Sequence, residues 1–183
     1  MAGGAGGPIA IRDADGQGNP VTKTYVPVAT RFEDRVAFFA PYGRWENWKV
    51  LNLTVDTQTG KVTVNHVWSA QDCGPAINPD GQKQQAEGCV MQGISRSLME
   101  EVKWDANGVI SRDWILYPVA RYLDMPKFDF QVISRTDQPA VGAGEVLITN
   151  MPAAISNAIF DATGTRMRQL PFTPPRVRAA LVA

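Results

Sequence analysis

Apolar and polar residues alternate with a period of two along residues 48–55 and again along residues 61–68. This alternation is typical of strands that bury one face. Residues 57–60 (Thr-Gln-Thr-Gly), which lie between the two segments, form a turn sequence. The pattern therefore predicts a β-hairpin near the middle of the chain.

The chain's single histidine, His66, lies within the second predicted strand. Its phase matches that of Val62, Val64 and Trp68, so we expect a half-buried side chain on the same face as these residues. A role as a metal ligand or catalytic residue is the less favoured interpretation. A site built from several histidine ligands is excluded because there is only one histidine.

Two later segments also carry strand signals. Residues 102–104 and 109–111 flank an Asp-Ala-Asn-Gly sequence at 105–108, whose Asn-Gly suits the positive φ angles of a tight hairpin. Residues 128–133 alternate in the manner of a further strand. We therefore expect a second, shorter hairpin and one additional strand.

A long helix is predicted to begin at Asn78, where Asn-Pro-Asp combines a capping side chain with a proline in the first turn. Its pattern extends roughly to Val102. Small residues recur within it, namely Ala86, Gly88, Gly93 and Ser95. Because each glycine costs a helix about 1 kcal/mol relative to alanine, we expect a neighbouring backbone or a ligand to need this space.

A second helix is predicted between Asn150, a capping residue, and Gly164, which suits the left-handed conformation that ends a helix. Pro152 falls in the first turn, where its missing N–H costs nothing. The apolar residues that share one helical face are Ile155, Ala158, Ile159 and Ala162. Two main helices among mixed strands, without regular βαβ repetition, predict an α+β domain.

A glycine-rich turn at residues 138–145 (Gln-Pro-Ala-Val-Gly-Ala-Gly-Glu) delivers one carboxylate just ahead of the second helix. Gly142 and Gly144 lack a Cβ, so the backbone there can take positive φ and approach a bulky ligand, with Glu145 at the mouth of the turn. Taken alone, Glu145 is also compatible with an ordinary solvated loop residue, because exposure is the default for glutamate.

The end of the chain resembles a known family. Gly-Ala-Gly-Glu at 142–145, the helix sequence at 152–164 and Leu-Pro-Phe-Thr-Pro at 170–174 are similar to the C-terminal end of the molybdenum-binding subunit of the xanthine oxidase family. Within that family the sequence looks most like the nicotinate hydroxylase and isoquinoline oxidoreductase group. Val146 directly follows Glu145, at a position where the family usually has proline.

A second block supports the same resemblance from a separate part of the chain. Asp-Cys-Gly at 72–74, Asn-Pro-Asp-Gly at 78–81 and Gln-Ala-Glu-Gly at 85–88 are similar to the family segment that packs around the pterin cofactor. The resemblance covers about residues 45–181 and implies the fold of the family's C-terminal molybdopterin-binding domain. Residues 1–44, rich in glycine and proline, are expected to form a separate, partly mobile segment, and residues 45–183 the domain.

The resemblance implies roles for particular residues. Glu145 would be the catalytic general base, and Gln85 matches the position that hydrogen-bonds the cofactor. Gln92 is a second candidate contact, because an amide both donates and accepts hydrogen bonds. Gly142, Ala143 and Gly144 would lie beside the cofactor. No residue is assigned as a direct metal ligand, and both glutamines are also compatible with an exposed helix face.

The resemblance also implies an activity and partners. The chain would be one part of a hydroxylase that oxidises an N-heteroaromatic carbon or an aldehyde with water as the oxygen source. Its molybdenum–pterin cofactor, in the cytosine dinucleotide form, would be shared with the remainder of the molybdenum-binding subunit. Electrons would leave through a partner with 2Fe–2S clusters, and onward to a cytochrome or flavin subunit. Two cysteines, Cys73 and Cys89, are too few for such a cluster here, and we expect both to be reduced.

Composition narrows the alternatives. The chain is 44% hydrophobic with 18 basic and 18 acidic residues, which indicates a globular protein and argues against nucleic acid as a partner. It has no apolar run of the ~20 residues that span a bilayer and no secretory signal pattern. We expect it on the cytoplasmic or periplasmic side of a bacterial cell. Gly-Gly-Ala-Gly-Gly at 3–7 is interpreted as a flexible terminus, not as a phosphate loop.

One hypothesis from a different class stays open. The chain could be a non-catalytic interaction module, or a cofactor-less fragment, that keeps the family's packing. Its tryptophans would then form a docking surface, since aromatic residues are enriched at interfaces. The residues in question are Trp45, Trp48, Trp104 and Trp114.

Overall fold

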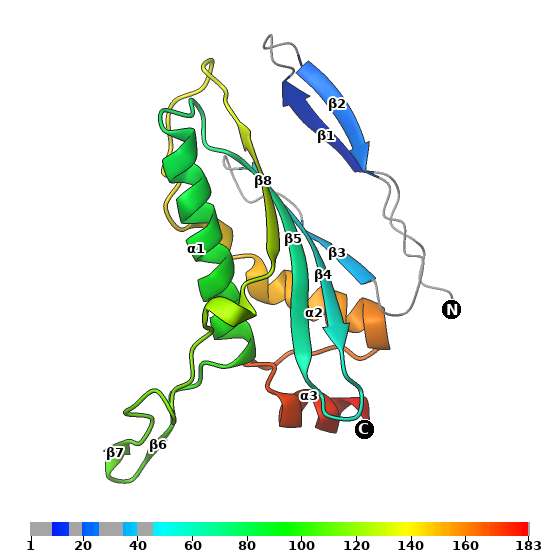
Figure 1. The fold of residues 1–183 in the computed structure, drawn as a ribbon, viewed down its shortest axis with the longest axis vertical. Helices are drawn as coiled ribbons and strands as arrows, with labels where there is room; N and C mark the ends of the chain where they lie inside the picture. Colours follow the sequence, from blue (N-terminus) through cyan, green and yellow to red (C-terminus); the bar gives the residue numbers. More distant parts are fainter. Residues whose placement is uncertain (1–8, 15–19, 26–34, 40–45, 183) are drawn as a thin grey trace.

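The computed structural model describes residues 9–14, 20–25, 35–39 and 46–182. Its centre is a four-stranded sheet in the order β3–β4–β5–β8 (Figure 1). The strands are β3 (Arg35–Phe39), β4 (Glu46–Val55), β5 (Val62–Asp72) and β8 (Lys127–Ile133). The first three pair antiparallel, whereas β8 runs parallel to β5. The predicted hairpin and the additional strand are both confirmed.

Two small hairpins lie outside this sheet. Strands β1 (Ile9–Ala14) and β2 (Pro20–Tyr25) pair with each other, as do β6 (Trp104–Asp105) and β7 (Gly108–Val109). Gly108 has a φ of 117°, which explains the Asn-Gly signal of the second hairpin. The sheet contains β3, on one side of the proposed boundary at residue 44, and β4 on the other. That domain boundary stays a prediction. The Gly-Gly-Ala-Gly-Gly sequence at 3–7 lies outside the described residues.

Three helices complete the fold in the described part of the chain: α1 (Pro79–Leu98), α2 (Met151–Thr163) and α3 (Pro174–Leu181). Single 3-10 turns occur at η1 (Tyr122–Asp124) and η2 (Val146–Ile148). Two of the three predicted caps form as expected, whereas Asn150 lies at the start of α2 without a capping hydrogen bond from its side chain. The Asn78 side chain accepts a hydrogen bond from the Gly81 N–H, and Gly164 ends α2 with a φ of 74°. The sequence patterns did not predict α3.

Helix α1 is shorter than predicted, because it ends at Leu98 and not near Val102. The carbonyl of Ser97 accepts a hydrogen bond from the N–H of Phe172, 2.6 Å away, where a continuing helix would supply the N–H of Glu101. A contact with a distant segment therefore terminates the helix, and local sequence does not reveal such a contact.

The helices cover one face of the sheet and form the main core with it. Strand β5 contributes Val62, Val64 and Val67, each less than 8% exposed. Helix α2 contributes its predicted apolar stripe, including Ile155 and Ile159, which are fully buried. The α+β prediction, with mixed strands and helices packed on them, is confirmed.

The small residues of α1 have two different environments. A Cβ on Gly93 would lie 2.5 Å from the Cβ of Met151, so this glycine lets α2 begin directly against α1. At Gly88 a Cβ would meet nothing within 4 Å. The neighbour that needs space at Gly93 is thus a side chain of α2, whereas Gly88 is an open position on the helix surface.

His66 is half-buried, as predicted, with 23% of its side chain exposed, but it lies on the opposite face from Val62 and Val64. The pairing register shifts so that Asn52 faces His66 while Leu53 faces Val64, which leaves Asn65 as an extra residue. This β-bulge inverts the period of two. The His66 ring stacks on Trp68 with centroids 3.7 Å apart, and its Nε2 lies 2.6 Å from an Asp129 carboxylate oxygen.

Candidate cofactor-binding site

The glycine-rich turn lies against the connection between β5 and α1. The N–H of Val141 donates to the carbonyl of Cys73 at 2.9 Å, and Gly74 has a φ of 83°. A Cβ on Gly74 would lie 2.5 Å from the carbonyl oxygen of Pro139. Gly74 is therefore the glycine that permits a close approach of two backbones, and it fixes where the turn lies.

Gly142 and Gly144 can take positive φ, but in the structure neither does. At both positions a Cβ would meet nothing within 4 Å. The two glycines therefore do not shape the turn through their dihedral angles. They leave a stretch of backbone without side chains around Ala143, which a flat ligand can approach closely.

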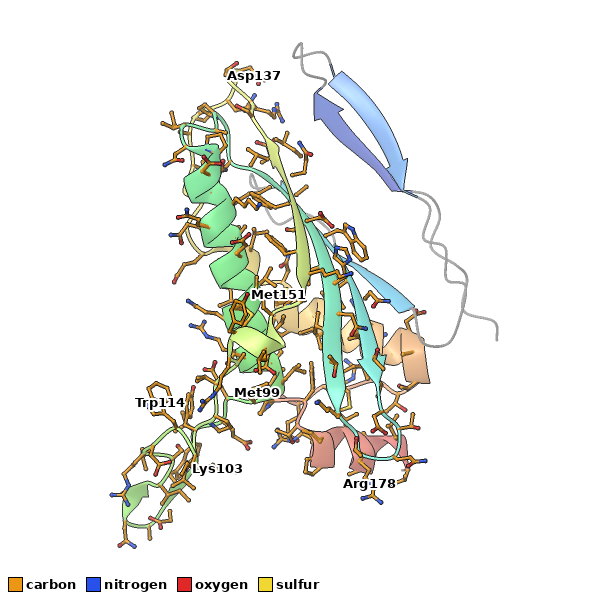
Figure 2. All side chains as sticks on the ribbon, in the orientation of Figure 1. Met99, Lys103, Trp114, Asp137, Met151 and Arg178 are labelled. Atoms are coloured by element: carbon orange, nitrogen blue, oxygen red, sulfur yellow. The ribbon has the colours of Figure 1, made fainter. Side chains whose placement is uncertain are left out.

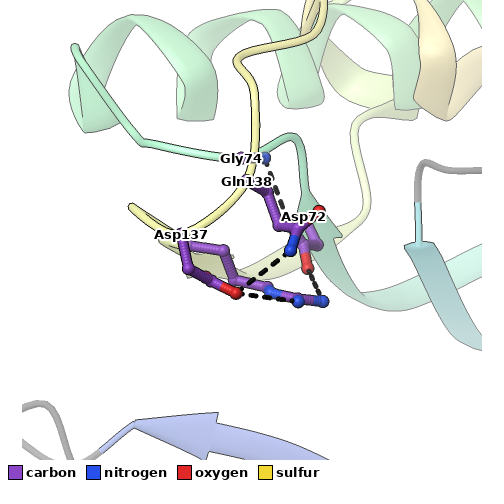
Figure 3. A network of polar contacts seen from close by, with 5 residues as sticks. Asp72, Gly74, Asp137 and Gln138 are labelled. Atoms are coloured by element: carbon purple, nitrogen blue, oxygen red, sulfur yellow. Dashed lines mark hydrogen bonds and ion pairs between the residues drawn. The ribbon is translucent and has the colours of Figure 1, made fainter.

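A polar network holds the preceding loop to the end of β5 (Figure 3). One Asp72 carboxylate oxygen accepts the Gly74 N–H at 3.0 Å, and the other lies 3.6 Å from the Arg135 guanidinium. Arg135 also contacts Asp137 at 3.2 Å, and the Gln138 side chain donates to the same carboxylate. These hydrogen bonds hold the pKa of Asp137 below its ordinary value. The loop that precedes the turn is thus fixed next to Gly74 by these hydrogen bonds and ion pairs.

Helix α1 holds the other end of the turn. The thiol of Cys89 donates to the carbonyl of Gly144 at 3.2 Å, one residue before Glu145. Just beyond, Leu147 of η2 packs in a small core with Ala86 and Cys89. Glu145 itself is exposed, and its carboxylate makes no hydrogen bond or ion pair with the described residues.

The two cysteines form no disulfide, as predicted, and both are buried. Burial raises the pKa of the Cys73 thiol, and the neighbouring Asp72 carboxylate raises it further, so this thiol stays protonated near neutral pH. Each cysteine contacts the turn region through one atom, Cys73 through its backbone carbonyl and Cys89 through its sulfur. Their role here is to position the turn.

The two predicted glutamines lie on one exposed face of α1. Gln85, Gly88 and Gln92 follow at helical spacing, so their side chains lie in a row along the helix. Gln85 and Cys89 are one turn apart, which places this row next to the residue that holds Gly144. The Gln92 amide oxygen accepts a long 3.4 Å hydrogen bond from Arg96. The structure therefore brings the glutamine row and the Glu145 turn to the same side of α1.

Three buried polar side chains beneath this region were missed by the sequence analysis. Gln71 is fully buried, and both its amide oxygen and nitrogen lack a hydrogen-bond partner. Ser69 and Gln82 are 6% exposed, and the Ser69 hydroxyl and the Gln82 amide oxygen are also without partners. The Gln82 amide nitrogen contacts the sulfur of Cys73. The phase of Val62 and Val64 would place Gln71 outward, and the bulge at Asn65 turns it inward, so the periodic pattern carried no signal for it.

The arrangement fits a flat, polar cofactor in two respects. Exposed amides on α1 can donate and accept hydrogen bonds, and the bare backbone at 142–144 allows close contact. The free carboxylate of Glu145 adds a group that can accept a proton beside such a cofactor. Within the described residues no group of three or more His, Cys, Asp or Glu side chains is placed to hold a metal ion. Among the described helices, none is long and apolar enough to cross a membrane.

Comparison with known proteins identifies the family. Residues 13–126 match the model of the molybdopterin cofactor-binding domain. A polypeptide of the nicotinate dehydrogenase of Pseudomonas putida is 42% identical over 137 residues, which are 75% of this chain and 12% of that protein. Quinoline 2-oxidoreductase of Pseudomonas putida, a solved structure, superposes with a TM-score of 0.70 at 25% identity over 75% of this chain and 19% of its own. Aldehyde oxidoreductase of Desulfovibrio gigas, also a solved structure, gives a TM-score of 0.68 at 32% identity, over 76% of this chain and 16% of its own.

The chain therefore belongs to the molybdopterin cofactor-binding domains of the xanthine oxidase family, whose members are molybdenum-dependent oxidoreductases. The resemblance drawn from the sequence motifs is confirmed. The chain spans only 12% to 19% of the length of these three proteins. The roles of Glu145, Gln85, Gln92 and residues 142–144 stay predictions.

Proposed function

We propose that this chain forms part of the catalytic unit of a molybdenum hydroxylase. Its substrate would be an N-heteroaromatic ring of the nicotinate or isoquinoline type, or an aldehyde, with water as the oxygen source. One observation carries the proposal: a turn ending in the free carboxylate of Glu145 is fixed beside the glutamine row of α1, in a chain of the molybdopterin-binding family.

The molybdenum–pterin cofactor, when bound, supplies the two-electron redox chemistry. The chain's own residues would hold and orient it. Gln85 and Gln92 present amide groups that match the donors and acceptors at a pterin edge. The backbone at residues 142–144 would lie against the cofactor, because no side chain intervenes there.

Glu145 would act as the general base. Its carboxylate would accept the proton of a water-derived nucleophile. The oxygen of that nucleophile would at the same time attack the substrate carbon. The Cys89 contact at Gly144 and the buried Leu147 on either side fix the backbone that carries Glu145. Such fixing keeps the carboxylate within hydrogen-bond reach of the reacting atom.

The remaining parts of the enzyme would lie outside this chain. The remainder of the molybdenum-binding subunit would supply the other cofactor contacts and the substrate pocket. A partner with 2Fe–2S clusters would accept the electrons and pass them to a cytochrome or flavin subunit. The cofactor would be of the cytosine dinucleotide type, and the complex would work on the cytoplasmic or periplasmic side of a bacterial cell.

The test is a Glu145→Gln substitution in the complex that this chain forms, assayed with nicotinate, isoquinoline and an aromatic aldehyde. We expect kcat to fall by ~10²–10⁴-fold, because the amide cannot take up the proton. The molybdenum content per complex should stay unchanged. Glu87→Gln, at a half-buried glutamate of α1, is the matched control and should retain kcat. Undiminished turnover by Glu145→Gln would refute the assignment.

A further inference from the structure

The segment from residue 102 to residue 124, here called the arm, projects from the end of α1 as a loop that carries the β6–β7 hairpin (Figure 1). Figure 2 shows its labelled residues Lys103 and Trp114 beyond Met99, away from the sheet. None of its residues is buried. Its largest apolar side chains are nevertheless exposed: Trp104 by 72%, Trp114 by 69%, Ile115 by 87%, Tyr122 by 89% and Leu123 by 94%.

The arm is shaped by its own carboxylates. Asp105 accepts a hydrogen bond from the Asn107 N–H at 2.7 Å, and Asp124 accepts one from the Arg121 N–H at 2.8 Å. Asp113 accepts two, from Ile115 and Leu116, both at 2.9 Å. All three acidic side chains of the arm are therefore used to fix turns, and the turns hold the apolar side chains outward without burying them.

The arm is also attached to α1 at its base. The hydroxyl of Tyr117 donates to the Glu100 carboxylate at 2.8 Å, and the N–H of Ala120 donates to the hydroxyl of Ser95 at 2.9 Å. A segment that is fixed at its base and at its turns presents a defined surface. Several large apolar side chains exposed on one such segment mark a site of interaction with another macromolecule.

Charge limits the kind of partner. The three basic side chains of the arm, Lys103, Arg112 and Arg121, form no ion pair within the described residues. A partner surface that fits the arm would thus be mainly apolar, with carboxylates at its rim that meet these basic side chains. A polar rim around an apolar centre is the usual arrangement of a protein–protein interface, so the partner would be another folded polypeptide.

We propose that the arm is the docking surface for the remainder of the molybdenum-binding subunit. This inference rests on the proposed function. The chain spans 12% to 19% of the length of these relatives, and under the proposed function the remainder of the subunit supplies the other cofactor contacts. The end of α1 and Gln85 are about 20 Å apart at 1.5 Å per residue. One partner of domain size can therefore hold the arm and reach the glutamine row along the exposed face of α1.

The experiment uses the tagged full chain, produced in its native cells and recovered by affinity purification. The test variant combines Trp104→Ser, Trp114→Ser and Leu123→Ser. The matched control combines Trp104→Phe, Trp114→Phe and Leu123→Met, which keeps the apolar character at the same positions. A second control, Val182→Ser, removes an 80% exposed apolar side chain outside the arm. Molybdenum and the co-purifying polypeptide are quantified per tagged chain, and the thermal midpoint is measured for each variant.

We expect the serine variant to recover at least about tenfold less molybdenum and partner polypeptide, with an unchanged thermal midpoint, because aromatic anchors dominate interface energies. Both controls should recover as much as the wild type. Full recovery of molybdenum by the serine variant would overturn the docking proposal and leave the proposed function standing. A wild-type complex without molybdenum would refute the proposed function and with it the identity of the partner. A wild-type chain that dimerises through the arm, with molybdenum recovery unchanged in the serine variant, would assign the surface to a second copy.

Discussion

The turn at residues 139–145 and the arm at residues 102–124 are both exposed, but they are held in different ways. The turn is fixed from outside itself, by the backbone of Cys73 and the thiol of Cys89, and it exposes glycine, alanine and a carboxylate. The arm is attached to α1 only at its base, whereas its turns are fixed from within by carboxylates that accept hydrogen bonds from its own backbone, and it exposes tryptophan, leucine and isoleucine.

This difference shows what each region can bind. A backbone surface without large side chains, next to amides and one carboxylate, suits a small polar ligand that needs close contact. A preformed apolar surface suits another folded polypeptide. The two regions lie towards opposite ends of α1, so one helix connects the proposed cofactor site with the proposed docking surface (Figure 1).

The largest expected change in stability is at Gly93, on which the support of the turn depends. Gly93→Ala places a Cβ 2.5 Å from the Met151 side chain and displaces the start of α2. We expect the free energy of unfolding to fall by about 1–3 kcal/mol, measured by chemical denaturation. Gly88→Ala is the matched control in the same helix. It meets open space and should stabilise the chain by up to about 1 kcal/mol. Equal effects at both positions would contradict the α1–α2 contact.

A smaller change is expected at Gln71, beneath the turn. The fully buried amide lacks partners for both its oxygen and its nitrogen, so Gln71→Met removes two unsatisfied groups at similar volume. The free energy of unfolding of the isolated chain should rise by about 1–2 kcal/mol. Thr63→Met, at an exposed position of the same strand, is the control and should change it little. Destabilisation by Gln71→Met would show that the amide has partners within the chain.

The smallest expected effects on stability test whether the turn and the arm are held independently of each other. Cys89→Ala removes the hydrogen bond to Gly144, and Asp113→Ala removes those to Ile115 and Leu116. Each should lower local stability by about 0.5–1.5 kcal/mol. Amide hydrogen exchange should quicken in the turn alone for the first variant and in the arm alone for the second. Cys89→Ser, which keeps a donor, should restore protection of the turn. Faster exchange in both regions from either substitution would contradict their independence.

Much of the fold could be predicted because local chemistry determines it. Asn78 and Gly164 bound α1 and α2 as expected, because capping side chains and left-handed glycines act within a few residues. The face of His66 was wrong because a single extra residue, Asn65, inverts the strand period. The end of α1 was wrong because Phe172, far along the chain, takes the Ser97 carbonyl. Bulges and long-range contacts leave little trace in a periodic pattern.

In the candidate site, too, some features could be predicted from the sequence and others could not. The sequence motifs identified the turn and the helix that meet there, and the family comparison confirmed the resemblance. The glycine that fixes the turn, with positive φ, is Gly74, whereas the sequence analysis singled out Gly142 and Gly144. The buried amides of Gln71 and Gln82 were missed, because a polar residue in a strand or helix gives no sign that its side chain points inward.

The most direct test of the account is the metal content of the complex that contains this chain. The tagged chain is purified from its native cells, and molybdenum and iron are quantified by elemental mass spectrometry. The account predicts nearly one molybdenum per chain, together with iron from the 2Fe–2S partner. An intact, folded chain recovered without molybdenum would contradict it and would favour the interaction module that the exposed tryptophans otherwise suggest.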